Sequence, residues 1–118
     1  MYHSHQELVN NLKVEGVKLK VTQQVDSLLM TELEFQKGAS LPEHVHQTDH
    51  SGYLLQGKIC MTIDGVRREL VKGDSWCIAK NLRHSTEAME YSIVIEVYGK
   101  ELEDIQDYIC DKALDMKA

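Results

Sequence analysis

The sequence is poor in the residues that mark membrane-spanning or disulfide-bonded proteins. Its apolar runs, such as Ile93–Ile95, fall far short of the roughly 18 residues of a spanning helix. The 118 residues include one proline, one tryptophan and one phenylalanine. The three cysteines are an odd number at wide spacings without a CxxC pair, which fits reduced thiols in the cytoplasm better than a disulfide framework. These deficits argue against a membrane protein and against a disulfide-stabilised exported one.

Cations are also scarce. The 13 Lys and Arg residues face 19 Asp and Glu residues, so the net charge is −6. A general nucleic-acid binder needs clustered cations for phosphate contacts, and we therefore expect no nucleic-acid partner and no membrane partner. The hydrophobic content of 42% is typical of a folded protein. This length suits one domain, which we assign to residues 1–118 with a core at about 28–98.

Apolar and polar residues alternate through much of the chain, which is the pattern of half-buried β-strands. The segment 17–21 shows this alternation, and 91–98 is the strongest strand candidate. A loop is expected around 37–42, and Asp64-Gly65 predicts a two-residue hairpin turn. Many short strands separated by turns predict an all-β sandwich or barrel.

The C-terminal segment has a different period. Apolar residues recur at helical spacing there: Leu102, Ile105, Ile109 and Ala113. We predict one amphipathic α-helix over 101–116, which would cover a face of the barrel or a dimer interface. A homodimer is expected because an antiparallel barrel must protect its edge strands.

Histidines form the most informative cluster. His44, His46 and His50 lie within seven residues, and His84 follows 34 residues after His50. On a strand, residues two apart share a face, so these imidazoles could converge on one cavity. Imidazole is a good ligand for divalent transition metals such as Zn, Fe, Mn or Ni. Each histidine could instead be a hydrogen-bonded structural residue. The N-terminal His3 and His5 are interpreted as solvated.

The glycines around these histidines resemble the first motif of the cupin superfamily, G-x5-H-x-H-x3-4-E-x6-G. Here Gly38 precedes His44 by five intervening residues, and Gly57 follows His50 by six. His50 stands where the motif has glutamate. The second cupin motif is matched at Gly73 and His84, while Asn81 replaces its second glycine.

The resemblance implies a small antiparallel jelly-roll β-barrel that is usually dimeric and holds a divalent metal. Carried over by position, the metal ligands are His44, His46, His50 and His84. Four neutral imidazoles would leave a divalent ion with a net charge of about +2, against about +1 when one ligand is a carboxylate. An anionic ligand should bind such an ion preferentially.

Further segments resemble single-domain cupins of the pectin-degradation type, which act on unsaturated uronates. Glu96 and Tyr98 match the acidic residue and the aromatic residue on the late strand of that group, and Leu102 stands in place of an arginine. Glu96 could face solvent in an alternating strand, or face the cavity as a general base with Tyr98 sharing its proton. Tyr53, Trp76 and Met89 could line the cavity or the sandwich core, and the core is the commoner role for such residues.

Three functions remain open from the sequence. The first is a metal-dependent enzyme acting on a small anionic, oxygen-rich molecule, either as an isomerase or lyase or as a dioxygenase. The second is a non-catalytic module that binds a metal or a small acid. The third is a structural dimer whose histidine cluster no longer binds a metal.

Overall fold

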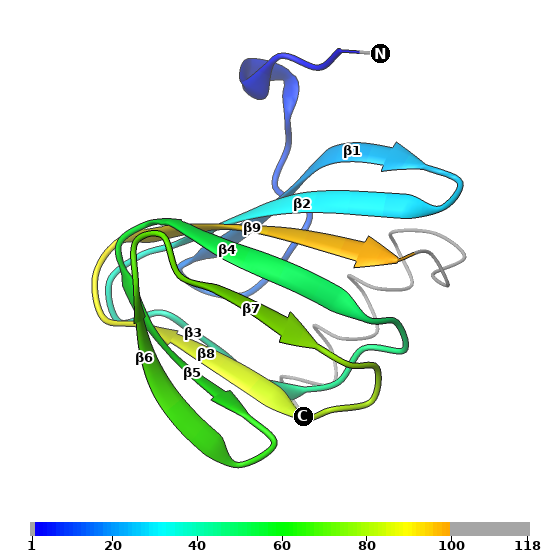
Figure 1. Ribbon diagram of the computed structural model, residues 1–118. Helices are drawn as coiled ribbons and strands as arrows, with labels where there is room; N and C mark the ends of the chain where they lie inside the picture. The colour runs from blue at the N-terminus through cyan, green and yellow to red at the C-terminus, as the bar shows by residue number, and fades with distance from the viewer. Residues whose placement is uncertain (1, 100–118) are drawn as a thin grey trace.

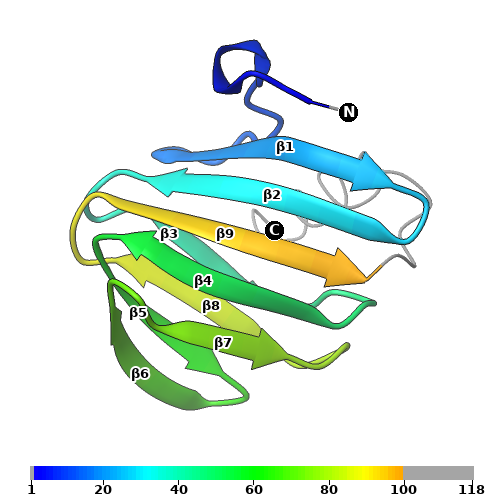
Figure 2. The same ribbon diagram turned by 45° about the horizontal axis from the view of Figure 1, so that its top comes forward.

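Two antiparallel β-sheets face each other in this protein, whose computed structural model describes residues 2–99 (Figure 1). The larger sheet has five strands in the order β1-β2-β9-β4-β7. They are β1 (Val17–Val25), β2 (Leu28–Phe35), β9 (Ser92–Gly99), β4 (His50–Gln56) and β7 (Ser75–Ile78). The turned view in Figure 2 shows this sheet nearly face-on, with the second sheet behind it.

The second sheet has four strands in the order β3-β8-β5-β6. They are β3 (Ser40–His44), β8 (His84–Ala88), β5 (Lys58–Ile63) and β6 (Val66–Val71). A short 3-10 helix, η1 (His5–Glu7), precedes the strands. The predicted all-β jelly-roll architecture is therefore confirmed, whereas the helix expected over 101–116 lies outside the described residues. Within residues 2–99, no helix has the length and apolar character needed to span a membrane.

Two of these strands have bounds that the apolar pattern of the sequence does not mark. β3 contains the only proline, Pro42, and lies at the edge of its sheet. Proline is tolerated on an edge strand, because its missing N–H removes no hydrogen bond from the interior of the sheet. β8 is short and rich in Ser, Thr and Glu, so it lacks the apolar alternation that marks a strand in the sequence.

The interior between the sheets is filled by alternate residues of the strands, as the pleat requires. On β2 and β9 the buried set is Leu29, Thr31, Leu33, Phe35, Ser92, Val94, Glu96 and Tyr98. The intervening residues of β9 are only partly buried. The alternation places one carboxylate, that of Glu96, on the inward face of a central strand.

Strand register aligns these inward residues in rows across the large sheet. Glu96 pairs with Thr31 on one side and with Gly52 on the other, and Gly52 pairs with Trp76. A side chain at position 52 would overlap the Cε2, Cζ2 and Nε1 atoms of the Trp76 indole. Gly52 therefore lets the indole lie across β4 in the direction of Glu96, which is the close approach that a glycine inside a strand permits.

Left-handed turn residues connect the strands. Asp64 and Gly65 both have positive φ, at 50° and 81°, which confirms the predicted hairpin turn. Gly57, between β4 and β5, has a φ of 96°, and a Cβ there would overlap the Tyr91 carbonyl oxygen and Ser92. Gly57 is thus constrained both by its backbone conformation and by its close neighbours.

Replacing Gly57 by alanine is expected to destabilise the protein more than the same change at Gly73. Gly73 has an almost identical φ of 95°, but nothing lies within 4 Å of its added Cβ. Gly73→Ala should therefore report only the left-handed strain, about 1–2 kcal/mol. Gly57→Ala adds the overlap and should cost about 1–3 kcal/mol more. Urea unfolding measures both changes, and equal losses would contradict the importance of the close contact at Gly57.

Candidate metal centre

Four buried histidines gather where strands begin and end. His44 is the last residue of β3, His50 is the first of β4 and His84 is the first of β8. His46 lies in the loop between β3 and β4, and all four are at most 9% exposed. The expected strand through His46 is absent because β3 stops at His44. Convergence of these imidazoles depends on a loop as well as on strand alternation.

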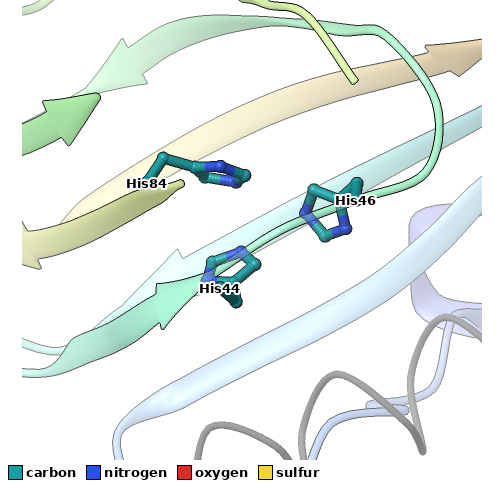
Figure 3. A group of neighbouring side chains, drawn as sticks. All are labelled: His44, His46 and His84. Carbon is teal, nitrogen blue, oxygen red and sulfur yellow. The ribbon is translucent and has the colours of Figure 1, made fainter. Parts of the chain in front are cut away.

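His44 and His84 are directly opposite each other across the β3–β8 pair. Their ring centroids are 4.3 Å apart (Figure 3). Nδ1 of His44 bonds the Pro42 carbonyl at 2.8 Å, and Nδ1 of His84 bonds the Leu82 carbonyl at 3.0 Å. Because a carbonyl only accepts, each Nδ1 carries the hydrogen, and each Nε2 keeps its lone pair for a metal.

The loop that carries His46 is held in place by backbone contacts. Asn81 N–H donates to the His46 carbonyl at 2.8 Å, and Lys80 N–H donates to Asp49 Oδ1 at 2.9 Å. The Asp49 carbonyl accepts from Gly99 N–H at 3.2 Å. These bonds place the His46 ring 4.8 Å from that of His44 and 5.0 Å from that of His84.

These three side chains form a group that could hold a metal ion. One nitrogen from each of His44, His46 and His84 lies within 4.8 Å of the others. Burial and the neighbouring His44 lower the pKa of His84 to about 4, so its ring is neutral near pH 7. Neutral, buried and convergent imidazoles are suitable ligands for a divalent transition metal. The donor set therefore fits the metal that the sequence predicted.

His50 adjoins this group but is not part of it. Its ring centroid is 5.1 Å from that of His46 and 5.2 Å from that of His84. Its Nε2 lies 3.4 Å from Glu96 Oε2, and its buried Nδ1 has no hydrogen-bond partner in the described part of the chain. The structure thus assembles three of the four predicted ligands as a group and places the fourth beside them. The four-histidine set stays a prediction.

Glu96 and Tyr98 lie on the same inward face of β9, next to His50. Glu96 is 8% exposed and Tyr98 is fully buried, so the solvent-facing alternative for Glu96 is wrong. Tyr98 donates a hydrogen bond of 2.7 Å to Glu96 Oε1 and stacks on His50 at 4.7 Å. Burial alone raises the pKa of Glu96, but the His50 contact and the Tyr98 hydrogen bond outweigh it and hold that pKa below its ordinary value.

A narrow cavity adjoins the cluster between the two sheets. His44, His84, Glu96 and Trp76 line it together with Thr86 and apolar core residues. Trp76 belongs to the core and also lines this cavity, so both roles that the sequence left open for it are met. For Tyr53 and Met89 the expected core role is wrong, since they are 46% and 37% exposed.

Comparisons with known proteins decide the family. The cupin domain family matches residues 31–97. The chain belongs to the cupin family. A cupin relative, the pectin degradation protein KdgF of Dickeya dadantii (strain 3937), is 30% identical over 92 residues. The match covers 76% of this chain and 84% of that protein. The resemblance inferred from the glycine and histidine spacing is confirmed.

Solved cupin structures share the fold. KdgF from a Halomonas species has a TM-score of 0.81 at 24% identity, covering 89% of this chain and 97% of that one. A cupin from Shewanella frigidimarina NCIMB 400 also has a TM-score of 0.81, at 22% identity, covering 88% and 94%. Oxalate decarboxylase of Bacillus subtilis, which has Mn(II) centres, has a TM-score of 0.76 at 18% identity, covering 88% of this chain and 30% of that one.

Acidification is expected to destabilise the metal-free protein through His84. Between pH 6.5 and about 4 the unfolded chain binds a proton at this residue that the folded chain does not bind. Stability should therefore fall as the pH drops through this window, by up to about 1.4 kcal/mol per pH unit. Urea unfolding of chelator-treated protein measures the slope. His84→Gln should flatten it, whereas His3→Gln, at an exposed position, should not. An unchanged slope in His84→Gln would contradict this assignment.

Proposed function

We propose that this cupin is a metal-dependent enzyme that acts on a small anionic, oxygen-rich molecule, foremost a uronate-derived sugar acid. The observation that carries the proposal is the position of a buried carboxylate, Glu96, beside a cluster of buried histidines. The relationship to a pectin degradation protein supports the substrate class, because pectin breakdown releases uronates. Isomerase or lyase chemistry suits such a substrate.

The metal would be held by His44, His46 and His84, with His50 as the fourth ligand. Each of the first three is buried, and two have their Nδ1 atoms bonded to backbone carbonyls. Nε2 of His50 faces Glu96, an arrangement in which a carboxylate orients an imidazole and increases its basicity. A divalent ion bound by neutral imidazoles supplies Lewis acidity and keeps a net charge of about +2. That charge favours an anionic ligand.

Glu96 is the proposed general base, and Tyr98 is the group that shares its proton. The lowered pKa keeps the carboxylate ionised near neutral pH, which is the form that accepts a proton. The Tyr98 hydroxyl donates to Oε1, so it fixes the carboxylate and stabilises its charge. Both groups sit on the rigid central strand β9, which holds the base in one position relative to the histidines.

Metal binding is the first test. Zinc should bind untagged wild-type protein at one ion per chain. His44→Ala and His84→Ala should each weaken binding by more than about 100-fold, because even the loss of a residue that only orients a ligand costs 10–100-fold. His5→Ala is the control, since His5 is exposed and pairs with Glu32. Calorimetric titration measures the affinities. Unchanged affinity in His50→Ala would exclude His50 as a ligand, and unchanged affinity in all three variants would exclude this metal site.

Turnover is the second test. With a panel of unsaturated uronates and keto acids, Glu96→Gln should lose at least about 100-fold in kcat while keeping its zinc, because the amide is not a base. Glu90→Gln, at an exposed turn position, should retain full activity. Undiminished turnover in Glu96→Gln would rule Glu96 out as the base. Stoichiometric metal with no turnover of any panel member would favour the alternative of a non-catalytic binding module. Oxygen consumption would indicate a dioxygenase.

A homodimer and a cytoplasmic location also belong to this proposal. Edge strands that need protection support the dimer, and three cysteines at wide spacings without a CxxC pair support the cytoplasm. Light scattering at micromolar protein concentration tests the dimer, and a monomeric mass would contradict it.

A further inference from the structure

The indole of Trp76 carries a buried polar group without a hydrogen-bond partner. Trp76 is 8% exposed, and its Nε1 has no acceptor among residues 2–99. A buried N–H without a partner lowers the stability of the fold by roughly 1–3 kcal/mol, so this group calls for a physical explanation. The same side chain lines the cavity that adjoins the histidine cluster. An acceptor supplied by a bound molecule would satisfy this N–H.

The edge of the Trp76 indole that carries Nε1 lies over Gly52, the residue between Trp76 and Glu96 in the strand register. Both residues pair with Gly52 from opposite sides, and both line the cavity. Strands two positions apart are about 9.6 Å from each other, and the indole shortens this span by leaning over the glycine. A donor and an acceptor therefore border one narrow space, with no side chain of position 52 between them.

Glu96 can accept one more hydrogen bond in this space. Its Oε1 accepts from Tyr98, and its Oε2 faces His50. A carboxylate offers about four lone-pair positions, so acceptor capacity remains. A group that lies between Trp76 and Glu96 must accept from the indole and donate to the carboxylate. A hydroxyl does both, whereas a carboxylate has no hydrogen to donate.

The size of the cavity limits what can enter. Its free space is about 10 Å³, which is roughly the room for one water-sized group. A single hydroxyl meets that limit, and the rest of the ligand would remain on the side of the histidines. The lining contains Leu33, Phe35 and Val94, so a hydroxyl would find few competing polar partners there.

We infer that Trp76 is a specificity-determining residue, whose Nε1–H donates to a hydroxyl of the bound ligand while that hydroxyl donates to Glu96. The inference rests on the proposed function and narrows its substrate class to hydroxy acids, with the hydroxyl in the inner cavity and the anionic group toward the histidines. Gly52 is the positioning residue that gives the indole its place.

The chain has a single tryptophan, so one indole N–H signal in a ¹H–¹⁵N spectrum reports on this site alone. Zinc-loaded protein is titrated with glycolate and with acetate, which differ by one hydroxyl. Glycolate should move the indole signal downfield and bind about tenfold more tightly by calorimetry, while acetate should leave the signal in place. Glycolate binding without movement of this signal would overturn the inference, even if no variant could be prepared.

Trp76→Phe keeps an aromatic ring and removes the donor. This variant should bind zinc as the wild type does and should lose the tenfold preference for glycolate. Tyr53→Phe, on the exposed face of β4, should keep it. A preference that survives in Trp76→Phe would show that glycolate is selected at the metal alone and would overturn the inference. A wild-type protein that does not bind zinc would instead refute the proposed function. Failure of this inference and failure of the proposed function are therefore distinguishable.

Discussion

The pairing of β3 with β8 is the constraint on which the site depends. It places His44 opposite His84, and the carbonyls of Pro42 and Leu82 fix the hydrogen on Nδ1 of each ring. The orientation of both imidazoles is therefore set by backbone groups before any ligand binds. Such preorganisation lowers the entropy cost of assembling a metal site, since only the loop that carries His46 must be added. Backbone hydrogen bonds to residues near 80 hold that loop.

Glu96 is buried, and its position is likewise set by strand register. A carboxylate inside a β-sandwich is costly unless hydrogen bonds and opposite charge compensate for lost water. The Tyr98 hydroxyl donates to one oxygen of this carboxylate, and a ring nitrogen of His50 lies beside the other, both from adjacent inward positions of β9 and β4. The carboxylate is thus kept ionised in the interior, close to the histidines. Burying a charged group lowers stability, which is easier to understand for a group that transfers protons than for a purely structural one.

Much of the fold and part of the site could be predicted from the sequence. Alternation marked β9, and the Asp64-Gly65 turn and the spacing of Gly38, the histidines and Gly57 identified a cupin. The bounds of β3 and β8 could not be predicted, because Pro42 and a run of Ser, Thr and Glu hide the apolar alternation of a strand. Spacing also could not show that the strand ends at His44, or that His50 turns to Glu96. Those outcomes depend on register and loop contacts between residues far apart in the chain, as does the indole lying over Gly52.

The central claim is that imidazoles from β3, the following loop and β8 share one ion. Anomalous diffraction from zinc-soaked crystals at the zinc edge tests it most directly. The account predicts a single strong peak at zinc–nitrogen distances of about 2.0–2.1 Å from His44, His46 and His84. A peak elsewhere, or zinc bound by fewer than three of these residues, would contradict it.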